Sequence, residues 1–124
     1  MLGTSDIIAF VGVSDAGAAR KFYRDTLGLR LVSEDGFALA FDANGTILRV
    51  TLVPEVRPAN YTVLGWQVSD IIATVKHLNA AGVELQRYPG LNDRDELGIW
   101  TAPSGARIAW FKDPDGNVLS ITQF

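Results

Sequence analysis

The sequence predicts an α+β fold built from two βαβββ modules, and an internal repeat is the main reason. The segment Val13-Ser14-Asp15 reappears as Val68-Ser69-Asp70. In both copies a run rich in β-branched and aromatic residues precedes the Asp, and apolar residues at helical spacing follow it. Beyond each helix the pattern changes to that of strands. We therefore expect mixed, curved sheets that enclose a cavity, with the helices on the outer faces.

The boundaries of both helices can be predicted from single residues. Asp15 and Asp70 stand directly before the helical patterns and are expected to be N-caps. Gly28 and Gly82 follow those patterns and are expected in the left-handed conformation that often ends a helix. The apolar positions that define the two patterns are Ala19, Phe22, Tyr23 and Leu27 in the first and Ile71, Ile72, Val75 and Leu78 in the second.

Strand patterns fill most of the remaining chain. A single domain, 1–124, is expected, with modules 1–53 and 61–124 joined by the Pro-containing linker 54–60. The second module has one strand-like stretch more than the first, and we expect its strands around Trp100 and Trp110 to lack a counterpart in the first. The polar loop 89–98 is either a plain surface loop or a cover over a site. The predicted strands are 7–13, 29–32, 37–41, 46–53, 62–68, 83–88, 99–102, 107–111 and 118–124.

Composition limits the classes of function. The net charge of -3 argues against a nucleic-acid partner and against an anionic membrane surface, so small molecules or other copies of the chain are the expected partners. The chain has no cysteine, which excludes disulfides and thiolate chemistry. It shows neither a secretory leader pattern nor an apolar run of membrane-spanning length, so a cytoplasmic location is the default expectation.

Strand alternation indicates which side chains line the expected cavity. Trp100 and Trp110 are candidates for an aromatic wall, with packing in the core as the alternative. The only histidine, His77, lies off the apolar stripe of its helix and is expected in solvent. Neither a Gly-x-Ser-x-Gly nucleophile motif nor a glycine-rich phosphate loop occurs. The positions expected to face the cavity are Ile8, Phe10, Arg49, Thr51, Val63, Gln67, Val118, Ser120 and Thr122.

Three segments carry a resemblance to a known family. FYRDTLGL at 22–29, the two Val-Ser-Asp helix starts and FKDPDGNVLSI at 111–121 resemble the vicinal oxygen chelate superfamily of glyoxalase I, bleomycin-resistance proteins and extradiol dioxygenases. The resemblance implies a metal site made by His, Gln or Glu at four equivalent strand positions. Those positions fall here on Ile8, Arg49, Val63 and Ser120, and none of these residues is a good ligand for a divalent transition ion. The sequence therefore predicts a metal-ligand-deficient member that uses no metal and no cofactor.

The predicted function is metal-independent binding or sequestration of a small aromatic or anionic molecule, without an assigned catalytic residue. The alternative is a metal-dependent lyase, isomerase or dioxygenase of the same superfamily, similar to lactoylglutathione lyase. Arg49 either orients an anionic group of the ligand, pairs with a nearby acid, or points to water at the rim. The resemblance also implies a homodimer. The candidate ligand-binding residues are Phe10, Arg49, Gln67, Trp100, Trp110 and Ser120.

Overall fold

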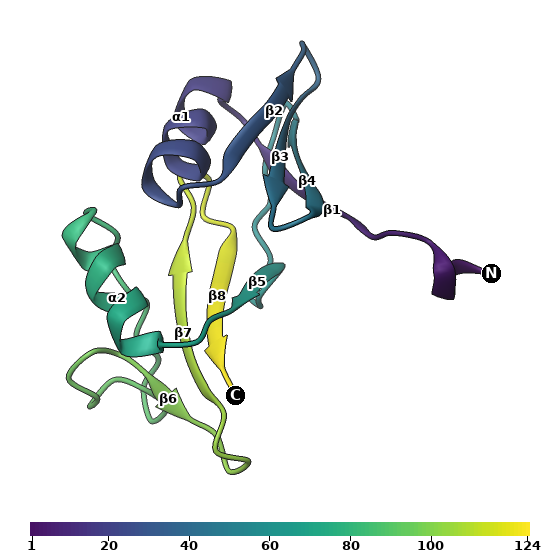
Figure 1. The fold of residues 1–124 in the computed structure, drawn as a ribbon. Coiled ribbons are helices and arrows are strands. Elements are labelled where there is room, and N and C mark those ends of the chain that lie inside the picture. Colours follow the sequence, from purple (N-terminus) through teal and green to yellow (C-terminus); the bar gives the residue numbers. More distant parts are fainter. The chain divides into compact units, whose positions relative to one another are not determined.

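The computed structural model describes residues 1–124, which divide into two compact units, 1–57 and 58–124. The division after Arg57 lies within the predicted linker 54–60. Each unit contains one βαβββ module, as the element order along the chain in Figure 1 shows. The predicted α+β fold with two such modules is confirmed.

Unit 1 holds a four-stranded mixed sheet with the strand order β1-β4-β3-β2. Strand β1 runs parallel to β4, whereas β4, β3 and β2 are joined as antiparallel neighbours. A short 3₁₀ turn, Leu2–Thr4, precedes the sheet. The other elements are β1 (Ile8–Val13), α1 (Ala16–Arg20), a π-helical segment (Lys21–Thr26), β2 (Arg30–Glu34), β3 (Ala38–Ala43) and β4 (Thr46–Leu52).

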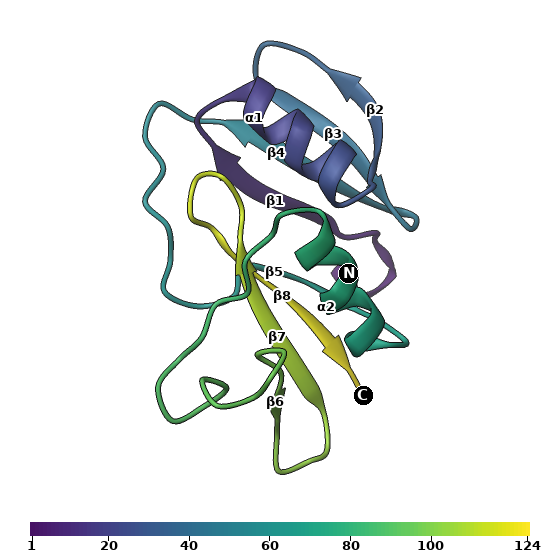
Figure 2. The same cartoon turned by 90° about the vertical axis from the view of Figure 1, so that its left-hand side faces the viewer.

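The core of unit 1 lies between α1 and one face of its sheet (Figure 2). Alternate strand residues point to that face and are shielded from solvent, among them Val13, Phe41 and Val50 at 0% exposure. Tyr23 of the helical segment is also fully buried and lies with its ring centroid 6.0 Å from that of Phe41. The opposite face of this sheet carries no helix of unit 1.

The first helix begins and ends where the sequence predicts, but it changes type midway. The Asp15 carboxylate accepts a hydrogen bond from the Ala18 N–H at 2.9 Å, and Gly28 has a positive φ of 78°. After Arg20 the turns widen, so that the Leu27 N–H donates to the Phe22 carbonyl five residues earlier. The apolar spacing predicts a helix here but does not say which helix type forms.

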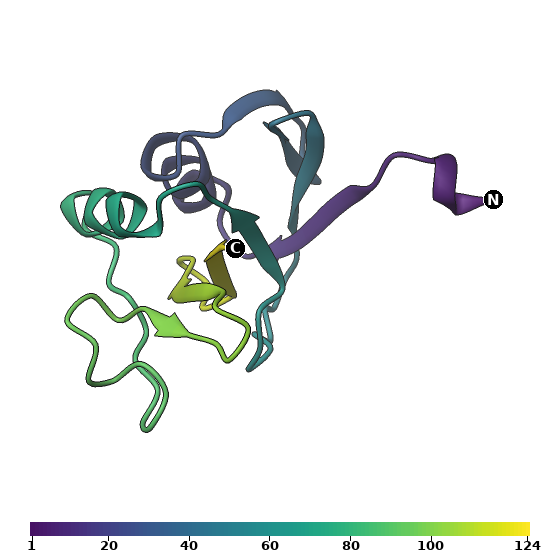
Figure 3. The same cartoon turned by 60° about the horizontal axis from the view of Figure 1, so that its bottom comes forward.

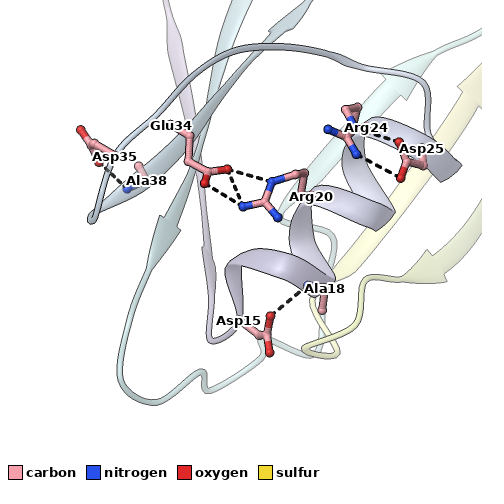
Figure 4. Close-up of polar contacts among 8 residues, drawn as sticks. All are labelled: Asp15, Ala18, Arg20, Arg24, Asp25, Glu34, Asp35 and Ala38. Carbon is pink, nitrogen blue, oxygen red and sulfur yellow. Dashed lines mark hydrogen bonds and ion pairs between the residues drawn. The ribbon is translucent and has the colours of Figure 1, made fainter.

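Two ion pairs lie on the surface of the helical region, and one of them joins α1 to the neighbouring strand β2 (Figure 4). The Arg20 guanidinium donates to both carboxylate oxygens of Glu34 at 2.7 Å. One turn further on, Arg24 bonds Asp25 at 2.8 Å and lowers the pKa of that carboxyl. Exposed pairs of this kind contribute little to stability, so the helix is held mainly by its apolar face.

The Asp35 carboxylate is expected to make a small contribution to stability that is lost in acid. It accepts hydrogen bonds from the Phe37 N–H at 2.8 Å and from the Ala38 N–H at 2.9 Å, the second of which is drawn in Figure 4. These bonds lower the pKa of the carboxyl from its ordinary value. The contribution is therefore present above the unfolded-state pKa, about 4, and is lost as the pH falls through the lower folded-state pKa. We expect the melting temperatures of the wild type and Asp35→Asn to converge between pH 5 and about pH 2. A constant difference over this range would contradict the assignment.

Unit 2 repeats the topology of unit 1, with the strand order β5-β8-β7-β6 and a parallel β5·β8 pair. The strands of Trp100 and Trp110 occupy the places that β2 and β3 occupy in unit 1, so the prediction that they lack a counterpart is wrong. The predicted strand 83–88 is also wrong, since only an isolated bridge between Gln86 and Trp110 forms there. The elements are β5 (Leu64–Gln67), α2 (Ile71–Ala80), β6 (Trp100–Thr101), β7 (Arg107–Lys112) and β8 (Val118–Gln123).

Helix α2 packs on β7 and β8 with three of the four residues of the predicted apolar stripe, whereas Ile72, the fourth, is 37% exposed. Ile71, Val75 and Leu78 are buried, whereas His77 is exposed as expected. The Asp70 carboxylate caps the helix by accepting from the Ala73 N–H at 3.0 Å, and Gly82 ends it with a φ of 87°. Neither this helix nor α1 has the length and apolar character needed to span a membrane.

The segment between α2 and β6 is a chain of turns (Figure 3) organised by two side chains. Asn92, which is 2% exposed, donates to the carbonyls of Gln86 and Gly98 and accepts from the Tyr88 N–H at 2.7 Å. The Arg87 guanidinium donates to the carbonyls of Asp95 and Glu96, the latter at 3.0 Å. These bonds satisfy the backbone groups of a segment that forms no sheet.

Each sheet keeps two edges, so neither closes on itself. The edges are β1 and β2 in unit 1 and β5 and β6 in unit 2. The face away from the helix carries both exposed residues, such as Phe10, and buried ones, such as Ser120. A cavity enclosed by curved sheets stays a prediction.

Candidate functional site

The sheet of unit 2 places most of the predicted ligand-binding residues on its helix-free face. Directly opposite residues in neighbouring strands point to the same side of a sheet. Trp110 lies opposite Ser120, which in turn lies opposite Gly65. The next row joins Gln67, Thr122 and Ile108, and Ile108 lies opposite Trp100. Trp100, Trp110, Gln67 and Ser120 therefore share one face.

Three aromatic rings form a continuous surface on this face. Trp100 and Trp110 are stacked, with ring centroids 6.1 Å apart and planes inclined by 30°. Tyr88, from the turns that precede β6, meets Trp110 edge-on at a centroid distance of 5.5 Å. All three side chains are only partly buried. Both tryptophans thus lie outside the helix-packed core, where Trp66 stacks on Phe111 instead.

An open hollow of about 240 Å³ adjoins the aromatic surface. Besides Tyr88 and Trp110, its lining includes Tyr61, Thr62 and Leu91. A second hollow of about 340 Å³ shares three lining residues with the first and is lined in addition by Lys112. The residues common to both hollows are Asn60, Tyr88 and Val118.

Sequence reasoning missed most of the residues that line these hollows. It selected Trp110 and Val118 from their strands, but Tyr61, Tyr88 and Leu91 lie outside the strands that form, and Tyr88 was assigned to the predicted strand 83–88. A usable signal was the presence of aromatic residues beside Asn60 and Pro89. Such residues are exposed unless a neighbouring element covers them.

The sheet of unit 1 carries the other two predicted residues on its helix-free face. Phe10 is 59% exposed and lies opposite Arg49, whose other neighbour is Ala40. Arg49 is partly buried and forms neither a hydrogen bond nor an ion pair, although its charge contributes to lowering the pKa of Asp35. The predicted pairing of Arg49 with a nearby acid is therefore not formed at contact distance.

The four positions that the resemblance associates with a metal do not fit one. Ile8 and Val63 are 51% and 40% exposed and carry no donor atom. The Arg49 guanidinium has no lone pair to donate to a metal, and Ser120 offers only a buried hydroxyl. No three His, Cys, Asp or Glu side chains come close enough together elsewhere to hold an ion. Divalent transition ions need imidazole, thiolate or carboxylate ligands, which these positions lack.

The chain belongs to the glyoxalase/bleomycin resistance protein/dioxygenase superfamily, whose family model matches residues 6–121. No curated protein matches the sequence. Among solved structures, the fold is similar to a glyoxalase family protein from Enterococcus faecalis, with a TM-score of 0.78, 18% identity and coverage of 98% of this chain and 99% of that one.

Two further structures show the range of the family. A lactoylglutathione lyase from Agrobacterium tumefaciens is 18% identical, with a TM-score of 0.73 and coverage of 96% of this chain and 93% of that one. A superfamily member from Sphaerobacter thermophilus is 24% identical, with a TM-score of 0.71 and coverage of 95% and 97%. At these identities the similarity establishes the fold.

Proposed function

We propose that this protein binds a small aromatic molecule and does so without a metal ion. The observation that carries the proposal is the surface formed by Trp100, Trp110 and Tyr88, which borders an open hollow on a sheet face that no helix of its unit covers. Aromatic rings left partly open beside a hollow offer stacking and edge-to-face contacts to a planar ligand. A cluster that only stabilised the fold would be expected to be fully buried, whereas these three side chains are partly exposed.

The size of the hollow fits a ligand with one or two rings. An apolar cavity of about 150 Å³ is sufficient for benzene. The hollow beside Trp110 measures about 240 Å³ and is open to solvent, so it can receive a substituted ring without enclosing it. The chemistry of the family's metal positions supports the metal-free part of the proposal, since Ile8 and Val63 supply no ligand atom.

Replacing Trp110 is expected to weaken the binding of aromatic ligands about tenfold, because the ring loses its main stacking partner. Trp110→Leu keeps an apolar side chain on β7 and so limits the loss of stability. Isothermal titration with 2-naphthylmethanol would measure the effect. Phe124→Ala is the matched control, because this terminal ring is 83% exposed and lines neither hollow. Unchanged affinity in folded Trp110→Leu would contradict the proposed site.

Metal content and enzymatic activity test the proposal that binding needs no metal ion. We expect the purified protein to contain less than stoichiometric metal, and nickel or zinc to leave its melting temperature unchanged. The same preparations would be assayed on a glutathione hemithioacetal, the substrate expected for the alternative lyase function. Stoichiometric bound metal together with turnover would overturn the proposal in favour of that enzyme.

A further inference from the structure

We infer that the ligand is an aromatic anion, with its ring on the Tyr88–Trp110 surface and its negative group at Lys112. This inference rests on the proposed function and specifies the chemical class of the ligand. It also identifies which of two cationic side chains would meet the negative group of the ligand. Arg49 was the candidate from the sequence, whereas Lys112 lines a hollow that adjoins the aromatic rings within one unit.

The two hollows adjoin each other. They share the lining residues Asn60, Tyr88 and Val118 and so lie side by side, and the two together are termed the groove. Tyr61 and Trp110 line only the first hollow, and Lys112 lines only the second. A ligand longer than one ring would therefore contact aromatic carbon at one end and an ammonium group at the other.

Lys112 is the one charged residue that lines the groove. No Asp or Glu lines either hollow, and Lys112 forms no ion pair. The nearest acid along the chain, Asp113, is 5% exposed, and its oxygens accept from the Asp115 and Asn117 N–H groups and from the Asn117 amide. The Asp113 carboxylate is thus engaged in its own turn, and the Lys112 ammonium is available to an anion.

The same residues argue against a cationic ligand. Two tyrosines and a tryptophan around a hollow would on their own suit a quaternary or primary ammonium through cation–π contacts. A lysine beside those rings repels such a ligand, while an anion gains from the charge and from up to three hydrogen-bond donors. Lys112 therefore decides the sign of the ligand's charge.

The test compares three probes of the same ring size: 2-naphthoate, 2-naphthylmethanol and 2-naphthylmethylammonium. Isothermal titration would use the wild type, Lys112→Met, which keeps the apolar stem of the side chain, and Arg49→Ala. Lys76→Met is the matched control, because Lys76 is exposed on α2 and lines neither hollow. A thermal melt of each variant confirms that it is folded.

We expect the wild type to bind the three probes in the order anion, neutral, cation. Lys112→Met should weaken naphthoate binding about three- to tenfold and leave naphthylmethanol unchanged, and added salt should weaken naphthoate binding only where Lys112 is present. Arg49→Ala and Lys76→Met should bind naphthoate as the wild type does.

Other results would contradict the assignment to Lys112, the class of ligand or the proposed function. Unchanged naphthoate affinity in Lys112→Met, or an equal or larger loss in Arg49→Ala, refutes the assignment to Lys112 and leaves the proposed function in place. Preferential binding of the ammonium probe refutes the class of ligand. Failure of the folded wild type to bind any of the three probes overturns the proposed function as well.

Discussion

Asn92→Ala is expected to destabilise the protein by about 2–4 kcal/mol, although Asn92 lies in a segment without regular secondary structure. The side chain is 2% exposed and holds three backbone groups, those of Gln86, Tyr88 and Gly98. Alanine would leave all three without their partner, and a buried polar group without a hydrogen bond is costly. Urea unfolding would measure the loss.

The same substitution should disturb the candidate site. The Tyr88 N–H donates to the Asn92 side chain, so its loss frees the backbone that holds the Tyr88 ring against Trp110. We expect a weaker near-UV circular dichroism signal from the aromatic side chains and weaker naphthoate binding. Asn79→Ala, an exposed position on α2, is the control and should change stability by less than about 0.5 kcal/mol. Equal stability of the two variants would contradict the role of Asn92.

Phe41→Ala should lower the stability of unit 1 by about 3–5 kcal/mol. The Phe41 ring is 0% exposed on β3 and adjoins the buried Tyr23 ring, so truncation leaves a cavity between the sheet and the helical segment. Phe37→Ala provides a matched control in the same hairpin, because the Phe37 side chain is 77% exposed. It should shift the urea midpoint by only a small fraction of the effect at Phe41. Similar losses in both variants would mean that the core does not depend on this ring.

The two destabilising substitutions act through different physics. Phe41 stabilises by filling a volume in an apolar core, where the cost of removal grows with the size of the cavity. Asn92 stabilises by satisfying backbone groups that no sheet or helix satisfies. A double variant should show nearly additive losses, since the side chains belong to different units and share no partner.

The topology could be predicted because it depends on local patterns that repeat. Asp15 and Asp70 cap helices through their own side chains, and Gly28 and Gly82 end them through positive φ, which are properties of short segments. Strand alternation also assigned Ser120 to the face that the structure leaves without a helix, where it lies opposite Trp110, a residue chosen only as a candidate for an aromatic wall. The strand predicted at 83–88 does not form, because β propensity alone does not provide a hydrogen-bonding partner.

The sequence by itself determined the two-module fold, the ends of its helices and the absence of good metal ligands at Ile8, Arg49, Val63 and Ser120, since each depends on residue type or on neighbours a few positions away. Only the tertiary structure decided which residues form the groove. Tyr61, Tyr88, Trp110 and Lys112 come from a connector, a turn segment and a strand, and no local pattern relates them. They meet because strand register and the bonds of Asn92 hold distant parts of unit 2 side by side.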